Sequence, residues 1–345
     1  MKAAVLNEFN RELALTEVED PRIQHPGDVI VRVTGAGVCG SDVHWIEGAF
    51  KDVLGAPEFP YVLGHENGGY VEAVGSAVTS LQVGDPVLAH PHITCGLCRA
   101  CRRNEASFCE SLRFPGIDGR TAGGFAELFR TTEHALVKLP PGTDPAPMAS
   151  LADAGLTAYH AVRRACGDLP ADGVAVVIGV GGVGYFALQL LRLFSPARLI
   201  AVDRVAEKLR DAETLGADLT LSAGDELVDQ VMEATGGTGV DLVMDCVGVA
   251  PVPEQSLAML RRGGVYSALG ADTGEACCGT LALTGRELTI KGNLVGTLGE
   301  LAELAQLAAR NRIQLTQTSY PLQDINRALS DLRHGTVRGR AVLVP

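Results

Sequence analysis

The stretch that decides the fold reads Val174-Ala-Val-Val-Ile178, followed by Gly179-Val-Gly181-Gly182-Val183-Gly184. The apolar run predicts a buried β-strand, and the helical pattern that begins at Gly182 predicts a helix directly after the turn. In this G-x-G-x-x-G arrangement Gly179 permits the tight turn, Gly181 lets the backbone approach a pyrophosphate, and Gly184 lets the helix pack close to the strand. The helix N-terminus would offer free N–H groups and a partial positive charge to the phosphates. The stretch therefore predicts a dinucleotide-binding fold.

An acidic residue at the expected spacing favours a nicotinamide coenzyme. Asp203 ends the next predicted strand, about 20 residues after the turn, where such folds place the carboxylate that binds the adenosine ribose. A carboxylate accepts hydrogen bonds from both ribose hydroxyls and repels a 2′-phosphate, so Asp203 favours NAD over NADP. Arg204 could tolerate that phosphate, which leaves dual use open. A glycine-rich turn that binds nothing is the alternative, and the strand, the helix and Asp203 together argue against it.

Strands and helices alternate around this motif, as they do in a doubly wound parallel sheet. The predicted strands are Val174–Ile178, Leu199–Val202, Asp241–Met244 and Val265–Leu269, and the predicted helices are Gly182–Phe194, Ala206–Leu215 and Glu254–Leu260. Residues 151–290 are therefore expected to form one α/β domain.

The rest of the chain is rich in short strands and loops. In residues 1–150, apolar runs broken by Gly-Asp and Pro-Gly pairs are typical of strands joined by tight turns. These runs are Val29–Val33, Gly69–Val74 and Pro86–Ala89. Residues 291–345 resemble this part again, with predicted helices near Leu298–Arg310 and Leu322–Leu332 and a strand at Ala341–Val344. The fold class is therefore α/β, with a β-rich domain beside the parallel-sheet domain.

Composition narrows the function. The chain has 345 residues, of which 46% are hydrophobic and 20% charged, and 29 basic against 41 acidic residues give a net charge of −12. This balance disfavours nucleic-acid or anionic-membrane partners, which need clustered Lys and Arg. No apolar run reaches the roughly 18 residues that a transmembrane helix needs. The charged start, with Glu8 and Arg11, is unlike a signal peptide, so we expect a cytoplasmic protein whose nine Cys are reduced.

Four cysteines lie close together in a predicted loop at about residues 90–112. They are spaced Cys95-x-x-Cys98-x-x-Cys101, with Cys109 following. Four thiolates can close a tetrahedron around zinc and leave no position for water, which is typical of a structural site. Four unrelated thiols are the alternative, but such clustering is improbable by chance. The pattern predicts a structural zinc that folds this lobe.

Two further residues could belong to a second, open zinc site. Cys39 follows Gly37-Val38, and His65 lies in Gly64-His65-Glu66. A catalytic zinc typically has three protein ligands and one open position. Taken alone, each residue reads more simply as a core or surface residue.

The whole set of motifs resembles the zinc-dependent medium-chain alcohol dehydrogenases, and bacterial secondary-alcohol dehydrogenases most closely. The resemblance covers the chain from end to end. It rests on Gly37–His44, Gly64–Gly69, the four-Cys lobe, Gly179–Gly184, Asp203, Leu151–His160 and Arg338-Gly339-Arg340. It implies a GroES-like catalytic domain over residues 1–150, a Rossmann domain over 151–290, a return to the catalytic domain over 291–345, and an active site between the domains.

The resemblance also implies a ligand set for a catalytic zinc. Cys39 and His65 match ligand positions, and the third position falls on Asp153, where many members have Cys. Asp153 could instead cap the following helix, and Glu66 is a competing ligand, resting on the metal or swinging onto it. Since oxygen replaces sulfur without a change of charge, we expect a stronger Lewis acid.

Other roles follow from the same resemblance. Ser41 and His44 would carry the hydroxyl proton from the alcohol to solvent, and Asp42 would orient His65, although an Asp in a turn is equally plausible. The coenzyme would be bound by Thr157, Gly179, Gly181, Gly182, Val183, Gly184, Asp203, Lys208, the backbone around Leu294, and Arg340 at the pyrophosphate. Lys208 also fits a solvated helix face.

The resemblance thus implies an enzyme with two zinc ions per chain that transfers a hydride between NAD(H) and a primary or, more strongly indicated, a secondary alcohol. The alternatives are a polyol dehydrogenase and a zinc-stabilised NAD-binding module without catalysis. Trp45 could wall the pocket or fill the core, and His90 and His92, although near the pocket in relatives, read first as surface residues. A homo-oligomer, with a tetramer favoured, is expected.

Overall fold

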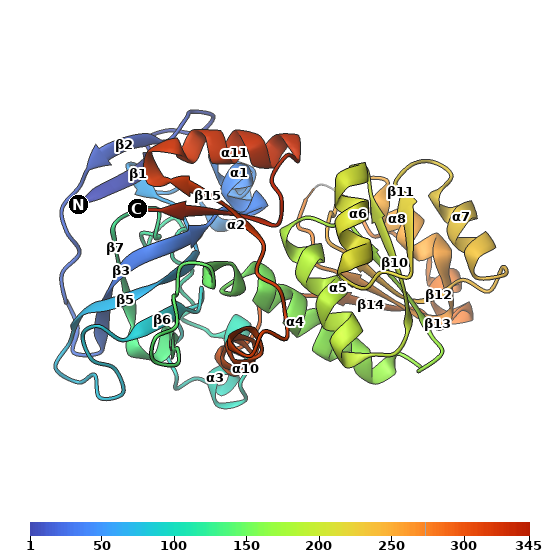
Figure 1. The fold of residues 1–345 in the computed structure, drawn as a ribbon, viewed down its shortest axis with the longest axis horizontal. Coiled ribbons are helices and arrows are strands. Elements are labelled where there is room, and N and C mark those ends of the chain that lie inside the picture. The colour runs from blue at the N-terminus through green and yellow to red at the C-terminus, as the bar shows by residue number, and fades with distance from the viewer. Residues whose placement is uncertain (273) are drawn as a thin grey trace. The chain divides into compact units, whose positions relative to one another are not determined.

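The structure, a computed structural model, describes residues 1–272 and 274–345. The chain divides into two compact units: unit 1 comprises Met1–Leu156 and Val295–Pro345, and unit 2 comprises Thr157–Leu294. Unit 1 is thus built from both ends of the chain. Figure 1 shows the red C-terminal strand β16 beside the blue β3, with which it pairs antiparallel.

Unit 2 is built on a parallel sheet of six strands in the order β11-β10-β9-β12-β13-β14. The strands are β9 (Val174–Ile178), β10 (Arg198–Asp203), β11 (Leu219–Ser222), β12 (Val240–Asp245), β13 (Leu260–Ala268) and β14 (Thr289–Gly292). The last four residues of β9 are at most 2% exposed, as expected for a strand covered on both faces. The order reverses direction between β9 and β12, and doubly wound sheets bind ligands at the carboxyl ends of the strands beside such a reversal.

Helices connect these strands and supply the rest of the unit's core. They are α4 (Ala154–Ala165), which begins in unit 1, α5 (Gly182–Phe194), α6 (Ala206–Thr214), α7 (Leu227–Ala234), α8 (Val252–Met259) and α9 (Thr280–Gly285). Eight consecutive residues of α5, Gly184–Leu191, are buried. This helix packs directly after the glycine turn, which places the turn at the carboxyl end of β9.

Unit 1 contains a seven-stranded sheet in the order β15-β16-β3-β5-β6-β8, with β7 paired to β3, and a three-stranded sheet, β2-β1-β4. The strands are β1 (Lys2–Leu6), β2 (Ala14–Glu17), β3 (Asp28–Gly37), β4 (Tyr61–Val62), β5 (Glu66–Val74), β6 (Pro86–Ala89), β7 (Leu128–Thr132), β8 (Leu136–Lys138), β15 (Gln317–Pro321) and β16 (Arg340–Val344). The helices are α1 (Gly40–Ile46), α2 (Lys51–Leu54), α3 (Arg99–Arg102), α10 (Leu298–Ala309) and α11 (Ile325–His334).

The core of unit 1 includes Trp45, which the sequence left between a pocket wall and the core. Its side chain is fully buried, and its Nε1 donates a hydrogen bond of 2.5 Å to the carbonyl of Ile117. The rings of Phe9, Phe50 and Tyr61 pack around it at 6.2 Å between centroids. Trp45 therefore anchors α1, which begins at Gly40, in the core.

The predicted elements agree with the structure where apolar runs are long. The bounds of β9 and α5 are confirmed, whereas Leu260 begins β13 instead of ending a helix. The predicted helix from Leu322 is wrong in its first turn, because Leu322–Asp324 is a 3-10 helix and α11 begins at Ile325. Strands β11 and β14 escaped prediction because they are short edge strands that are polar at alternate positions and at least half-exposed.

Along the described chain the longest helix is α5, with 13 residues, against the roughly 20 that cross a bilayer. None of these helices is both long and apolar enough to span a membrane.

Candidate metal centres and coenzyme site

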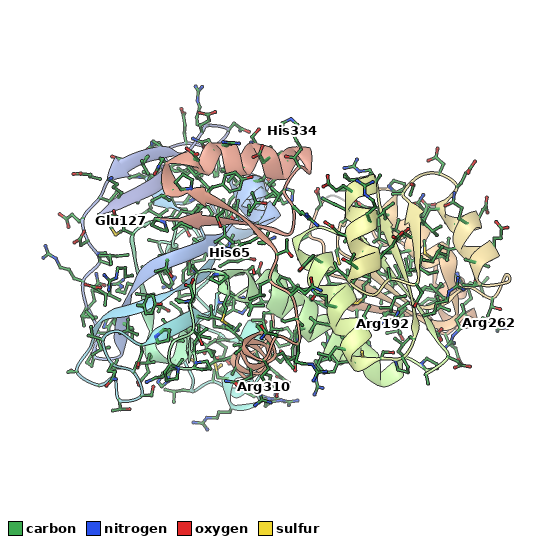
Figure 2. The ribbon with its side chains drawn as sticks, in the orientation of Figure 1. His65, Glu127, Arg192, Arg262, Arg310 and His334 are labelled. Carbon is green, nitrogen blue, oxygen red and sulfur yellow. The ribbon has the colours of Figure 1, made fainter. Side chains whose placement is uncertain are left out.

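Three side chains that can bind a metal lie together in unit 1. Cys39, His65 and Asp153 each offer one ligand atom, and these atoms lie within 4.8 Å of one another; His65 is labelled in Figure 2. Asp153 Oδ2 is 3.3 Å from His65 Nε2 and 3.7 Å from Cys39 Sγ. Around a tetrahedral zinc, with Zn–N and Zn–O near 2.0 Å and Zn–S about 2.3 Å, neighbouring ligand atoms are about 3.3–3.5 Å apart. The two distances from Asp153 are thus close to those between ligands of one zinc ion.

The pairing of β3 with β5 brings two of these residues together. The strands run antiparallel, and Gly37 at the end of β3 lies opposite Glu66 at the start of β5. Cys39 follows the first strand and His65 precedes the second, so both lie at the same end of the ladder. A gap of 26 residues in the sequence is thereby closed by ordinary strand register.

Asp42 supports the cluster from the first turn of α1. Its Oδ2 accepts a hydrogen bond of 2.8 Å from the backbone N–H of Cys39 and so fixes the residue that precedes the helix. Its Oδ1 lies 3.4 Å from Nδ1 of His65, and both atoms are buried without a hydrogen-bond partner. A metal-bound His commonly turns its second nitrogen toward a carboxylate. The geometry therefore fits a metal on the Nε2 side of His65.

The charges around His65 raise its pKa well above the ordinary value. Burial acts to lower it, but the negative charge of Asp42 and the contacts to Asp153, Asp42 and Cys39 outweigh burial. These surroundings stabilise the protonated imidazole, so a metal that binds Nε2 must compete with a proton.

Glu66 lies outside this cluster because its carboxylate already has partners. Its Oε2 accepts from Nε of Arg340 at 2.9 Å, and its Oε1 accepts from Nη2 of Arg340 at 2.5 Å. Oε1 also accepts a hydrogen bond of 2.9 Å from the backbone N–H of Ala154, the first residue of α4. Glu66 is therefore not among the three clustered ligand atoms, and a ligand role for it stays a prediction. Capping of α4 by Asp153 stays a prediction, because Glu66 takes only the first N–H of the helix and a cap accepts from the second or third.

Arg340 has a partner that the sequence did not predict. Its side chain is 5% exposed and is bound to Glu66, whereas the resemblance implied a pyrophosphate contact. Burial acts to lower the pKa of Arg340, but the charge of Glu66 raises it, so the guanidinium stays charged. A contact with pyrophosphate stays a prediction, and it would have to share this guanidinium with Glu66.

Ser41 and His44 both lie on α1. The Oγ of Ser41 is 3.3 Å from Nε2 of His65, directly beside the ligand atoms. The ring of His44, half-buried one turn further along, packs edge-on against Phe50 at 5.8 Å between centroids. The structure brings Ser41 to the cluster, while a relay from Ser41 through His44 stays a prediction.

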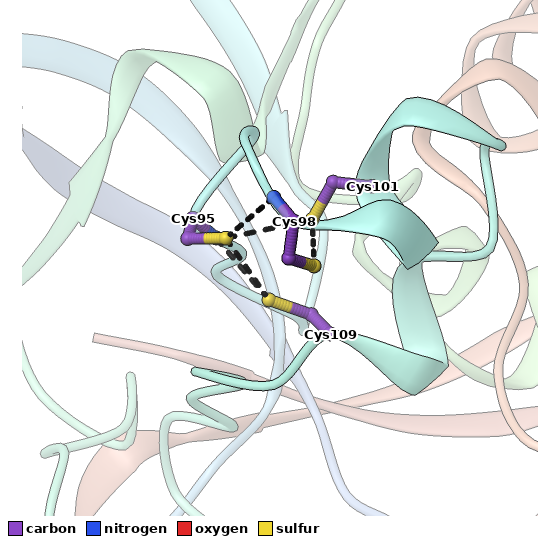
Figure 3. Close-up of side chains that lie close together, drawn as sticks. All are labelled: Cys95, Cys98, Cys101 and Cys109. Atoms are coloured by element: carbon purple, nitrogen blue, oxygen red, sulfur yellow. Dashed lines mark hydrogen bonds between the residues drawn. The ribbon is translucent and has the colours of Figure 1, made fainter.

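The four cysteines of the lobe converge as the sequence predicted (Figure 3). The Sγ–Sγ distances are 3.9 Å for Cys95–Cys101, 3.5 Å for Cys98–Cys101 and 3.7 Å for Cys109–Cys95. The edge of a ZnS₄ tetrahedron with Zn–S of about 2.3 Å is about 3.8 Å. Backbone N–H groups of Cys101 and Glu110 lower the pKa of Cys98 to about 6, which favours its thiolate. This donor set fits a closed, structural zinc.

The glycine turn of unit 2 has the predicted geometry. Gly179 has φ +86°, which favours glycine, and a Cβ on Gly184 would lie 1.8 Å from the Gly179 carbonyl oxygen. Asp203 is tied to this turn, since its Oδ2 accepts from the backbone N–H of Val180 at 2.8 Å and its Oδ1 from that of Val205 at 2.9 Å. The residue expected at the ribose thus also holds the phosphate turn in place.

The other predicted coenzyme residues of unit 2 are dispersed over its elements. Gly181 precedes α5, whose first residues are Gly182 and Val183; Lys208 lies on α6; Thr157 is buried on α4; and Leu294 is 55% exposed after β14. Asn293, beside Leu294, accepts from Arg164 Nη1 at 2.8 Å and donates to Ser267 Oγ at 2.9 Å. These bonds fix the backbone at which the carboxamide contact was predicted.

Two histidines that the sequence placed at the surface are buried, each 2% exposed. His90 Nδ1 accepts from the backbone N–H of His92 at 3.1 Å, and its Nε2 lies 3.0 Å from the Gly296 carbonyl. Neither ring nitrogen of His92 has a hydrogen-bond partner. The ring of Phe114 packs edge-on against both His92, at 4.7 Å, and His65, at 5.6 Å. Burial lowers the pKa of His92 to about 3, so it is neutral at ordinary pH.

Comparison with known proteins places this geometry in a family. Residues 25–141 match the alcohol dehydrogenase GroES-like domain, and residues 182–310 match the zinc-binding dehydrogenase domain. An alcohol dehydrogenase of Geobacillus stearothermophilus is 33% identical over 345 residues, covering 99% of both chains. The crystal structure of the alcohol dehydrogenase from Aeropyrum pernix is 43% identical, with a TM-score of 0.97 and full coverage of both chains. That of the D-arabinose dehydrogenase from Sulfolobus solfataricus is 26% identical, with a TM-score of 0.84, and covers 100% of this chain and 99% of its own.

The class defined by fold and site is therefore that of the GroES-like, Rossmann-type dehydrogenases. Within it, the chain belongs to the zinc-type medium-chain alcohol dehydrogenase family.

The four-Cys lobe predicts a loss of stability when one thiol is removed. Cys98→Ser should lose one zinc per chain and lower the unfolding midpoint by roughly 5–10 °C, because metal binding there is coupled to local folding. Metal analysis and calorimetry of the purified protein test this. Cys166→Ser, outside the lobe, is the matched control, and equal zinc content in both variants would contradict the site.

The raised pKa of His65 predicts that zinc uptake at the Cys39 cluster weakens as pH falls from 8 to 6, since protons then compete for Nε2. Asp42→Asn removes the charge that raises this pKa, so the pH at which the zinc affinity falls to half of its high-pH value should move downward. At pH 8 its zinc affinity should still fall roughly 10- to 100-fold, because the support behind His65 is lost. Chelator competition followed by metal analysis measures both effects. Identical pH curves for wild type and Asp42→Asn would show that Asp42 does not control His65.

Proposed function

We propose that this chain is a zinc- and NAD-dependent dehydrogenase that interconverts an alcohol, preferentially a secondary one, and the corresponding carbonyl compound. One observation carries the proposal: Cys39, His65 and Asp153 offer sulfur, nitrogen and oxygen at zinc-ligand spacing. A structural zinc has four protein ligands, whereas a catalytic zinc keeps a position open. Among the residues described, this cluster has three, and the four-Cys lobe supplies the closed site.

The residues around the cluster have complementary roles in the proposed reaction. Bound there, zinc would act as a Lewis acid that eases loss of the hydroxyl proton. Cys39 and Asp153 bring two negative charges, which neutralise a divalent cation. Ser41, 3.3 Å from His65 Nε2, would accept the hydroxyl proton, and His44 on the same helix would pass it toward solvent.

Unit 2 would bind the coenzyme, which supplies the hydride acceptor. The N–H groups at the start of α5 face the position that a pyrophosphate takes in this motif. Asp203 would bind the adenosine ribose and so favours NAD over NADP. Val183, Thr157, Lys208 and the backbone at Leu294 complete the proposed contacts.

A polyol or sugar substrate is the second candidate, and His92 is the observation that favours it. A buried imidazole with two unpartnered nitrogens is unfavourable unless something binds to it. Because Phe114 contacts the rings of both His92 and His65, His92 lies one ring away from the metal ligands. A second hydroxyl on the substrate would satisfy it, and the D-arabinose dehydrogenase to which this chain is similar acts, by its name, on such a molecule.

Metal content and activity together test the proposal. The wild type should contain two zinc ions per chain and reduce NAD with 2-butanol faster than with sorbitol. Asp153→Asn should lower zinc content toward one per chain and activity at least roughly 100-fold, because a carboxamide is a poor zinc ligand. Asp144→Asn, an exposed residue of the same unit, is the control. A wild type with one zinc and no activity would instead be a zinc-stabilised NAD-binding module.

A change of His92 separates the two substrate classes. If its nitrogens bind a second hydroxyl, His92→Phe should lower kcat/KM for sorbitol roughly 10-fold or more, the scale of one lost hydrogen bond to a buried group, and leave 2-butanol within about threefold. His134→Phe, on the exposed surface, is the control. Equal effects on both substrates would remove the argument for a polyol.

A further inference from the structure

Unit 2 contains a buried acid, Asp245, that is not among the proposed coenzyme contacts. Asp245 ends β12 and is fully buried. It pairs in register with Ile178, the residue immediately before the glycine turn. Since the strand order reverses between β9 and β12, Asp245 lies at the point where a doubly wound sheet opens its ligand crevice.

Both oxygens of Asp245 are used for positioning. Its Oδ1 accepts hydrogen bonds from the backbone N–H groups of Val247, at 2.8 Å, and Gly248, at 2.9 Å. Its Oδ2 accepts from the hydroxyl of Tyr266 at 2.8 Å, and Tyr266 is itself 2% exposed. The donors are all neutral, so the carboxylate is held in one orientation by directed hydrogen bonds. That orientation sets the backbone of the loop that follows β12.

The loop after β12 packs, through Val247, against Gly179, the first glycine of the phosphate turn. A Cβ on Gly179 would lie 2.5 Å from Cγ2 of Val247, so the Val247 methyl already occupies the space over that α-carbon. On its other side, a Cβ on Gly270 would lie 2.4–2.6 Å from the Val247 backbone. The N–H of Cys246 also donates to the Ile178 carbonyl at 2.9 Å. Val247 is therefore clamped, and its position limits the conformations open to Gly179.

We propose that Tyr266 and Asp245 are positioning residues for the coenzyme, because they hold Val247 against Gly179 and thereby keep the phosphate-binding turn in its binding conformation. The inference rests on the proposed NAD-binding function of unit 2. It assigns to a tyrosine on β13, two strands from the turn, an effect on coenzyme affinity without contact with the coenzyme. A turn that is already ordered loses less conformational freedom on binding, so the hydroxyl of Tyr266 should increase the affinity for the coenzyme.

The test compares NADH dissociation constants, measured by fluorescence titration of the zinc-loaded protein. Tyr266→Phe keeps the ring and removes one hydroxyl, and it should raise the Kd for NADH roughly tenfold while kcat at saturating coenzyme stays within about twofold. Val247→Ala removes the methyl contact with Gly179 and keeps the Tyr266–Asp245 bond. It should raise the Kd by a similar factor.

Tyr320→Phe is the matched control. Tyr320 donates to Asp331 Oδ2, also at 2.8 Å, and is 6% exposed, but it lies in unit 1. It should lower the unfolding midpoint as Tyr266→Phe does and leave the NADH Kd unchanged. Unchanged Kd values in Tyr266→Phe and Val247→Ala would overturn the inference, and if Tyr266→Phe does not fold, Val247→Ala decides alone. A wild type that does not bind NADH would overturn the proposed function as well. A wild type that binds NADH, with variants whose Kd is unchanged, would overturn this inference alone.

Discussion

The metal cluster depends on the buried ion pair between Glu66 and Arg340. This pair joins the first residue of β5 to the first residue of β16, and Glu66 also holds the first N–H of α4. Residues that neighbour these anchor points, His65 and Asp153, are the ones that offer ligand atoms. Removing one partner would leave a buried charge unpaired, at about 3–5 kcal/mol, and would free three segments at once. The ion pair therefore acts on the site through backbone placement.

Asp245 in unit 2 resembles Glu66 in unit 1, because each positions the backbone near a predicted binding site. Each is a fully buried carboxylate that accepts hydrogen bonds from backbone N–H groups and from one side chain. Each lies beside residues that are predicted to bind a ligand: Glu66 follows His65, and Asp245 pairs with Ile178, which precedes the glycine turn. Backbone N–H groups left unpaired in a buried loop are unfavourable, so a buried acid that accepts one or two of them helps to order the backbone around it.

The sequence predicted the fold class and the four-Cys lobe, because the spacing of glycines and cysteines is visible within a short stretch. It predicted Cys39, His65 and Asp153 because these positions match a family pattern. It could not predict the partners of Glu66 and Arg340, since both residues also fit roles at a ligand and only three-dimensional proximity shows that they neutralise each other. Burial of His90 and His92 was missed for a related reason: an isolated His carries no periodic signal, and its environment is set by Phe114 and Gly296, which are remote in sequence. Asp245 and Tyr266 gave no motif at all.

The two metal clusters differ in how much of the chain must fold before each exists. Cys95 and Cys109 are 14 residues apart, whereas Cys39 and Asp153 are 114 apart and Glu66 and Arg340 are 274 apart. Local contacts form quickly, and contacts distant in sequence wait for loop closure. The lobe can therefore capture its ion in a nascent, partly collapsed chain, while the second cluster matures last. Until those long-range contacts form, the Cys39 thiol has no enclosing fold and is open to oxidants.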